Sequence, residues 1–166
     1  MEYRFCPICG HELVKRKIDQ HDRKICEKCD FVYYENPTPA AGVICTQDDQ
    51  ILLVKRKFEP KAGDWSLPAG FVEYSEAPNE TAVRETKEET GLDVKVTQLF
   101  GVYGSCDDPR TRVVLVIYNV DIIGGKLQAG DDASEVMFFP KERLPANIAF
   151  SSHRHALNRF ILDNNS

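Results

Sequence analysis

Residues 70–92 carry the clearest structural signal in the chain and read GFVEYSEAPNETAVRETKEETGL. Pro78 suits the first turn of a helix, because its missing N–H would have no partner there. Gly91 suits the position just after the last turn, where glycine commonly ends a helix. These two residues predict a helix between them.

Three carboxylates of this helix gather on one side. At about 100° per residue, Glu85, Glu88 and Glu89 share one helical face. Such like-charged neighbours destabilise a helix by about 0.2–0.5 kcal/mol per pair. Mg²⁺ prefers oxygen ligands and bridges carboxylate to phosphate, so the face fits a hard-cation site. Gly70 would let the backbone approach closely and leave the Ala69 carbonyl free to join these ligands.

The charge around this helix is strongly acidic. Residues 73–93 hold seven acidic side chains and only two basic ones. This density repels phosphate unless a cation intervenes, although an ordinary solvated helix face is the alternative interpretation. Arg84 lies off the glutamate face, and we expect it to pair with Glu76 and hold the preceding loop against the helix.

Outward from the helix, the chain predicts a mixed sheet. A hairpin is expected where two apolar runs flank the polar residues 47–50. Further strands are expected at 94–103, 113–120 and 136–139, a turn at Gly124-Gly125, and a last helix at 152–162 capped by Ser151. The fold class is therefore α/β, with helices on the faces of the sheet.

The N-terminal segment differs in composition from the rest of the chain. Residues 1–35 are rich in cysteine and charge, with seven basic and seven acidic side chains. The run Asn36-Pro37-Thr38-Pro39 then interrupts regular structure. We place a domain boundary there and expect a small domain at 1–35 and a larger one at 36–166.

Two CxxC pairs in the small domain predict a zinc ribbon. Cys6 and Cys9 form the first pair, Cys26 and Cys29 the second, and 16 residues separate the pairs. Four thiolates at this spacing suit tetrahedral Zn²⁺, which would stabilise a segment too small for its own core. Disulfides and a redox CxxC are the alternatives, and an intracellular location argues against disulfides.

Bulk composition limits the function classes. The 166 residues include 42% hydrophobic and 28% charged residues, as in a globular protein, and the formal net charge is −5. No apolar run approaches the roughly 18 residues that span a bilayer, and the N-terminus lacks a secretory pattern. We therefore expect a cytoplasmic protein that does not associate with membranes.

The stretch quoted at the outset resembles the signature of the Nudix hydrolases, G-x5-E-x7-R-E-U-x-E-E-x-G-U, where U is a bulky apolar residue. The fixed positions match at Gly70, Glu76, Arg84, Glu85, Glu88, Glu89 and Gly91, and Leu92 fills the last U. Thr86 at the first U is the single departure. With its ribbon, the chain is similar over nearly its whole length to Nudix pyrophosphatases of ADP-ribose, NADH or FAD.

The resemblance implies hydrolysis of a phosphorus-containing anhydride with Mg²⁺ or Mn²⁺ and a Nudix α/β/α sandwich. Glu85 and Glu89 would be the principal metal ligands, joined by Glu88 and the Ala69 carbonyl. The remaining signature residues would be structural, namely Gly70, Glu76, Arg84 and Gly91.

Residues outside the signature are expected to complete the site. Members of the family often use one more acidic residue as ligand or base. Glu135 is the candidate here, with Asp107 and Asp108 as rivals. For substrate binding, the expected residues are Arg56, Phe58, Arg112 and Phe150, and Tyr74 is a further aromatic candidate.

Among substrates, the resemblance favours an adenosine diphosphate linked to another group, with ADP-ribose first and FAD or NADH next. Pro109 could be the loop proline typical of ADP-ribose enzymes. Two alternatives remain, removal of a nucleotide cap from RNA and a ligand-sensing regulator without activity. The formally neutral ribbon argues against nucleic acid, and intact glutamates argue against the regulator. The sequence leaves the oligomeric state open, a homodimer included.

Overall fold

The computed structural model of the protein describes residues 3–108, 111–130 and 132–164. The chain divides into two compact units, Met1–Pro37 (unit 1) and Thr38–Ser166 (unit 2). Within the described ranges, no helix is long and apolar enough to cross a membrane.

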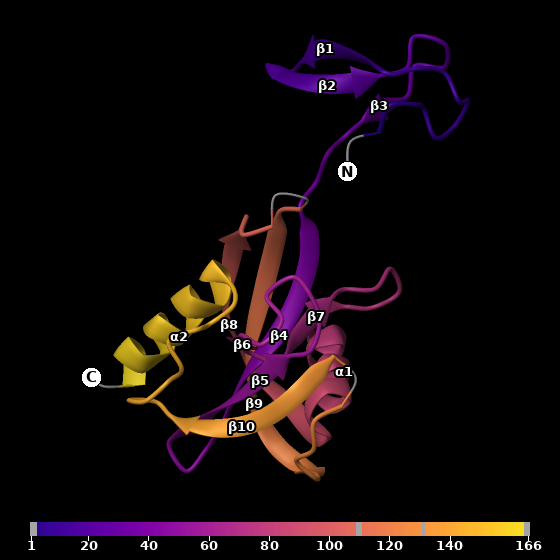
Figure 1. The fold of residues 1–166 in the computed structure, drawn as a ribbon. Helices are drawn as coiled ribbons and strands as arrows, with labels where there is room; N and C mark the ends of the chain where they lie inside the picture. Colours follow the sequence, from indigo (N-terminus) through magenta and orange to yellow (C-terminus); the bar gives the residue numbers. More distant parts are fainter. Residues whose placement is uncertain (1–2, 109–110, 131, 165–166) are drawn as a thin grey trace. The chain divides into compact units, whose positions relative to one another are not determined.

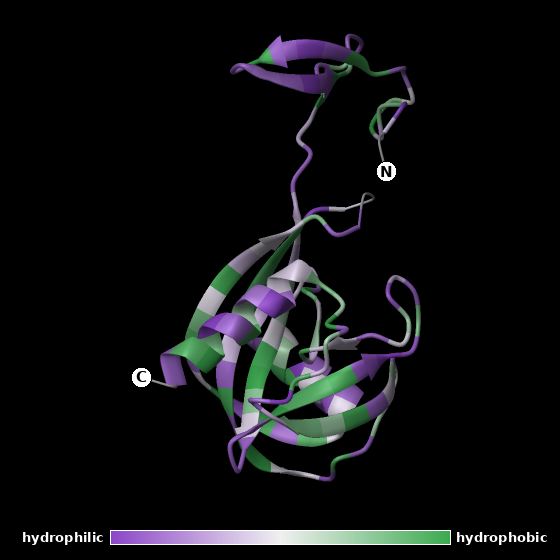
Figure 2. Ribbon diagram, turned by 60° about the vertical axis from the view of Figure 1, so that its left-hand side comes forward, coloured by the Kyte–Doolittle hydropathy of each residue, from purple (hydrophilic) through white to green (hydrophobic). Residues whose placement is uncertain are grey.

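Unit 1 is a small antiparallel sheet with very little core. Its strands are β1 (Val14–Ile18), β2 (His21–Ile25) and β3 (Val32–Tyr33), in the order β1-β2-β3. Between residues 3 and 37, only Cys6 and Cys26 are buried. The β1–β2 hairpin is predominantly hydrophilic, as Figure 2 shows. Apolar burial therefore contributes little to the stability of this unit.

Unit 2 is built on a mixed sheet, as we predicted. Its main strands are β4 (Thr38–Gln47), β5 (Gln50–Arg56), β8 (Leu92–Ser105), β9 (Val113–Gly125) and β10 (Ala133–Pro140), in the order β10-β5-β4-β9-β8. The short strands β6 (Trp65–Ser66) and β7 (Ala69–Phe71) pair with β5 and β4. Among the pairings between two described strands of this sheet, only β4–β9 is parallel.

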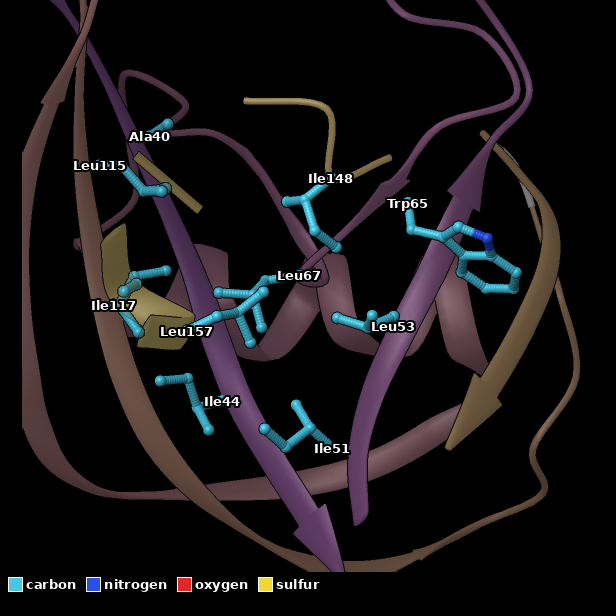
Figure 3. Close-up of a cluster of buried hydrophobic side chains, with 11 residues drawn as sticks. Ala40, Ile44, Ile51, Leu53, Trp65, Leu67, Leu115, Ile117, Ile148 and Leu157 are labelled. Carbon is cyan, nitrogen blue, oxygen red and sulfur yellow. The ribbon is translucent and has the colours of Figure 1, made fainter. Parts of the chain in front are cut away.

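Two helices cover the two faces of this sheet, α1 (Pro78–Thr90) and α2 (Ser151–Asn164) (Figure 1). Alternate residues of β4 face opposite sides. Ile44 joins the cluster that contains Leu157 of α2 (Figure 3), whereas Val43 joins the cluster that contains Ala82 of α1. The result is the α/β/α sandwich expected from the sequence, with separate cores that fix each helix.

Two local predictions were wrong. Gly124-Gly125 is not a separate turn, because both residues lie in β9 and pair with Asp93 and Leu92 of β8. Ser151 is the first residue of α2 and not a cap that precedes it. The carboxylate of Asp107 accepts hydrogen bonds from both the Ser151 N–H and its hydroxyl, each at 2.8 Å.

Candidate active site

The acidic site is held between β7 and α1. The helix begins at Pro78, and the Ala77 N–H just before it donates to the Glu80 carboxylate at 2.8 Å. It ends at Thr90, and the next residue, Gly91, has a left-handed φ of 73° that favours glycine. A Cβ at Gly91 would also lie 2.4 Å from the Lys126 carbonyl. These two ends fix the position of the glutamates on the helix.

Arg84 ties the loop before α1 to the helix. Its Nε and Nη2 donate to the two carboxylate oxygens of Glu76, at 2.6 and 2.9 Å. These hydrogen bonds lower the pKa of Glu76 to about 2. The pair was expected from the sequence, but Arg84 does more than this. Its Nη1 also donates to Glu85 at 2.7 Å and to Glu88 at 2.9 Å, so Arg84 reaches the acidic face.

Glu85 packs directly against the backbone of β7. A Cβ added at Gly70 would lie 2.1 Å from the Glu85 carboxyl carbon and from one of its oxygens. Only glycine therefore leaves room for the carboxylate in this position. Burial raises the pKa of Glu85, although the hydrogen bond from Arg84 opposes the shift.

Glu89 is the most deeply buried carboxylate of the group, with 7% of its surface exposed. Its Oε2 accepts a hydrogen bond from the Ala69 N–H at 3.1 Å. Burial raises the pKa of Glu89 to about 8, and this hydrogen bond only partly offsets the effect. A carboxylate desolvated to this extent favours protonation or a bound cation.

Asp132 is the fourth carboxylate, and the sequence analysis did not identify it. It lines an open acidic pocket together with Glu85, Glu88 and Glu89. Glu135, which we had favoured, is not among the described residues that line this pocket. It lies on β10, where its carboxylate pairs with Lys55 of β5 at 3.1 Å.

The donor set of this pocket fits a divalent cation. Four carboxylates supply hard oxygen ligands, and the segment Ala69-Gly70 brings backbone against two of them. One guanidinium, that of Arg84, cannot balance so much negative charge within one pocket. The residues that could hold the cation are Glu85, Glu88, Glu89 and Asp132.

A cavity of about 320 Å³ lies beside the acidic pocket. Ala69 and Gly70 line it, and they also contact Glu89 and Glu85. The cavity is largely apolar, with walls from β4, β7, β9 and the start of α2. Its volume suits part of a small-molecule ligand. A ligand could therefore extend from the acidic pocket into this cavity past residues 69 and 70.

Two of the four predicted substrate-binding residues line the cavity. Arg56 and Phe150 do so, with the guanidinium of Arg56 5.0 Å from the centre of the Phe150 ring. Phe58 and Arg112 do not line it. Both are exposed, and Phe58 lies beside the Lys57 ammonium group at 5.2 Å.

The other candidates from the sequence lie elsewhere. Tyr74 is fully exposed in the loop before α1. Asp107 and Asp108 line the cavity and not the acidic pocket, and Asp107 holds the start of α2. Burial opposes ionisation of Asp107, but hydrogen bonds from Ser105 and Ser151 outweigh it and lower its pKa. Pro109 lies outside the described residues.

In unit 1 the four cysteines of the CxxC pairs form a cluster. Their sulfur atoms all lie within 4.8 Å of one another, with Cys6–Cys29 at 3.6 Å and Cys9–Cys26 at 3.4 Å. A zinc ion bound tetrahedrally at about 2.3 Å would separate its sulfur ligands by about 3.8 Å. The cysteines are free, so the geometry fits one metal and not two disulfides. His11 and His21 are exposed and lie outside the cluster.

The comparisons with known proteins agree with this geometry. Residues 36–160 match the model of the NUDIX domain, and residues 4–35 match that of the Nudix N-terminal zinc ribbon. An ADP-ribose pyrophosphatase of Methanocaldococcus jannaschii is 45% identical over 139 residues, which cover 81% of this chain and 82% of that protein.

Two further relatives extend the similarity to nearly the whole chain. The NAD-capped RNA hydrolase NudC of Pseudomonas aeruginosa is 28% identical over 95% of this chain, which spans only 55% of that protein. The crystal structure of a NUDIX hydrolase from Nitrosomonas europaea is 31% identical, with a TM-score of 0.86. The match covers 98% of this chain and 93% of that one.

Proposed function

The chain belongs to the NUDIX domain family and is a Nudix hydrolase, and from this premise we propose that it cleaves the diphosphate linkage of ADP-ribose. Water would be consumed, and AMP and ribose 5-phosphate would be released. After ADP-ribose, FAD and NADH are the substrates for which we expect the next highest kcat/KM. The similarity to the Methanocaldococcus jannaschii ADP-ribose pyrophosphatase supports this choice.

The observation that carries the proposal is the buried carboxylate of Glu89 beside three other carboxylates. Glu85, Glu88 and Glu89 would bind Mg²⁺ or Mn²⁺, with Asp132 as the acidic residue from outside the signature. The carbonyl of Ala69 remains a further proposed ligand. A divalent cation bound there would neutralise the diphosphate and lower the pKa of a bound water molecule.

The protein's own groups would prepare this site before substrate binds. Arg84 limits repulsion between Glu85 and Glu88 by donating to both. Gly70 leaves the space that the Glu85 carboxylate occupies. Buried Glu89 gives up its proton more readily once a cation is near, because the cation stabilises the charged form.

The cavity supports a substrate with two parts. The diphosphate would lie at the acidic pocket, and one of its two substituents would enter the apolar cavity beside residues 69 and 70. Arg56, at the cavity wall, is the cation that could contact the substrate there. A nucleoside triphosphate has only one organic substituent, and its terminal phosphate is unsubstituted. It would therefore bring more negative charge to the carboxylates than an ADP-linked compound does.

For unit 1 we propose a structural zinc site at Cys6, Cys9, Cys26 and Cys29. The short distances between their sulfur atoms support one shared metal ion. Because few other side chains are buried in this unit, the metal would supply most of its folding free energy.

A second candidate function is the removal of an NAD cap from RNA. The similarity to NudC favours it, and so does a hollow of unit 1 lined by Lys15, Arg23 and Lys24, which Asp22 and Glu35 line too. The Arg23 guanidinium lies 4.4 Å from the centre of the exposed Tyr34 ring. Basic and aromatic side chains together suit single-stranded RNA. The formally neutral charge of residues 1–35 counts against this function.

A hydrolysis screen with Mg²⁺ and Mn²⁺ tests these proposals. Its substrates are ADP-ribose, NADH, FAD, diadenosine polyphosphates, nucleoside triphosphates and NAD-capped RNA. We expect the highest kcat/KM for ADP-ribose, with AMP and ribose 5-phosphate as products. A kcat/KM for nucleoside triphosphates at or above that of every ADP-linked compound would reject the first proposal. A preference for capped RNA would select the second.

A further inference from the structure

His153 is a buried histidine for which the proposed chemistry has no use. It lies in the first turns of α2 with 6% of its surface exposed, and it lines the 320 Å³ cavity. Its Nδ1 accepts a hydrogen bond from the Leu67 N–H at 3.1 Å. This bond fixes the orientation of the ring. It also leaves the proton of the neutral ring on Nε2.

The imidazole stays neutral under ordinary conditions. Burial lowers its pKa to about 4, and the charges of Arg56 and Arg154 act in the same direction while Asp107 opposes them. Because Nδ1 is occupied as an acceptor, Nε2 is a donor only. Within the described part of the chain, Nε2 has no hydrogen-bond partner. Nε2 is not among the fully buried polar atoms that lack a partner, so it is open to the cavity, where a ligand can supply the acceptor.

The walls of the cavity restrict which acceptor fits. Ala40, Phe71, Val113 and Leu115 give it apolar surfaces. The Phe150 ring lies 5.4 Å from the His153 ring and carries the Arg56 guanidinium on its face. A terminal ribose would bring several hydroxyl groups that each need a partner. Asp107 and Asp108 also line the cavity, but the Asp107 carboxylate already accepts hydrogen bonds from Ser105 and Ser151, and the other walls are largely apolar. A flat aromatic base with an acceptor on its edge suits the walls better.

We propose that His153 binds the purine base of the substrate, with its Nε2–H donating to a ring nitrogen of the base. The adenosine half of the substrate then occupies the cavity, and the ribose 5-phosphate half lies outside it. The inference rests on the proposed function for the identity of the substrate. Its test measures binding of a product and not turnover, so the two can fail separately.

The test compares two histidines of the same helix. In His153→Asn the side-chain oxygen can replace Nδ1 as the acceptor for the Leu67 N–H, while the donor at Nε2 is lost. His155→Asn is the matched control, because His155 is exposed on α2 and does not line the cavity. AMP and ribose 5-phosphate are titrated into each full-length protein in a calorimeter, with Mg²⁺ present.

We expect His153→Asn to weaken AMP binding about tenfold, the upper end for one neutral hydrogen bond. Ribose 5-phosphate should bind all variants alike, and His155→Asn should bind AMP like the wild type. Unchanged AMP binding by a folded His153→Asn protein would overturn the proposal. A selective loss of ribose 5-phosphate binding would overturn it as well, because the cavity would then hold the ribose half.

Ligand analogues test the same contact without relying on a variant that folds. The 1-deaza, 3-deaza and 7-deaza forms of AMP each replace one ring nitrogen with carbon. Against the wild type, one of the three should bind about tenfold more weakly than AMP, again the scale of one hydrogen bond. In His153→Asn that difference should disappear. If all three analogues bind the wild type as well as AMP does, no ring nitrogen of the base accepts a hydrogen bond from the protein and the proposal is wrong.

Discussion

The thiol cluster of unit 1 and the carboxylate cluster of unit 2 are both groups of like ligands, but their surroundings differ. The thiols lie in a unit where, between residues 3 and 37, only Cys6 and Cys26 are buried. Three of the four carboxylates lie on a helix whose other side packs into the core of a full sheet, and the fourth, that of Asp132, directly precedes β10. A cation would therefore replace a hydrophobic core in unit 1, whereas in unit 2 it would serve the reaction.

The charge around the two clusters supports the same distinction. In unit 2 the guanidinium of Arg84 donates to Glu76, Glu85 and Glu88, and it limits repulsion before any cation arrives. The four thiols have no such built-in cation within hydrogen-bonding distance in the described part of unit 1. We therefore expect unit 2 to fold without metal and unit 1 to require it.

The largest effect should follow from Cys26→Ser. Structural zinc sites supply about 10 kcal/mol or more of binding free energy, so losing one ligand should release the metal and unfold unit 1. Zinc content should fall from one per chain to near zero, and hydrogen exchange should lose its protection in unit 1 alone. Cys106→Ser is the control, since Cys106 is exposed in a loop of unit 2. Unfolding of unit 2 in the Cys26 variant would contradict the expectation that only unit 1 depends on this metal.

Next in size is Glu89→Gln in unit 2. Here the fold should persist, and kcat/KM for ADP-ribose should fall by about 10²–10³, the scale of losing one key electrostatic group. Glu142→Gln, at an exposed glutamate after β10, should leave the rate unchanged. Circular dichroism and steady-state kinetics on the same samples measure both properties. Near-full activity of the Glu89 variant at saturating Mg²⁺ would contradict its role.

Gly70→Ala should lower the rate of hydrolysis in unit 2 while changing its folding free energy very little. The three atoms nearest to the new Cβ all belong to the end of the flexible Glu85 side chain, which can swing away at little cost in folding free energy. The displaced carboxylate should lower kcat/KM about tenfold to a hundredfold, as expected for a shift of about 1 Å at a reacting site. Gly104→Ala is the matched control, because nothing lies within 4 Å of its added Cβ. A Gly70 variant that lost stability but kept its rate would point to backbone strain instead.

The smallest effect concerns acid stability and the buried His153, in contrast to exposed His11 and His21 of unit 1. Its folded pKa of about 4 lies below the usual value of 6.5, so the unfolded state binds the proton first. Stability should be complete above pH 6.5 and fall as the pH drops toward 4. Between pH 6.5 and 5.5 the loss should be about 1 kcal/mol. Denaturant unfolding of unit 2 should show this slope in the difference between the wild type and His153→Asn, because buried Glu89, with a pKa of about 8, adds a slope of opposite sign to both proteins.

The sequence predicted what depends on local pattern. Pro78 and Gly91 marked the ends of α1, and the i, i+3, i+4 spacing put three glutamates on one face. The glutamates recur at helical spacing, so no tertiary information was needed. The prediction of a turn at Gly124-Gly125 was wrong because the pairing of β9 with β8 extends through both glycines.

Residues brought in by tertiary contacts could not be predicted in this way. The choice between Asp132 and Glu135 depends on the register of β10 against β5, which has an irregularity between Ala133 and Glu135. His153 enters the cavity only because α2 packs into the core cluster that contains Leu67. Neither the register nor the packing of α2 leaves a signal in nearby sequence.

One measurement tests the distinction between the two clusters most directly. The full-length protein is passed by gel filtration into buffer without divalent cations, and its zinc content and ADP-ribose hydrolysis are measured before and after Mg²⁺ is added. We predict about one zinc per chain throughout, the stoichiometry of a four-thiolate site, with hydrolysis absent until Mg²⁺ restores it. Hydrolysis that persists without Mg²⁺ and follows the zinc content would contradict the account.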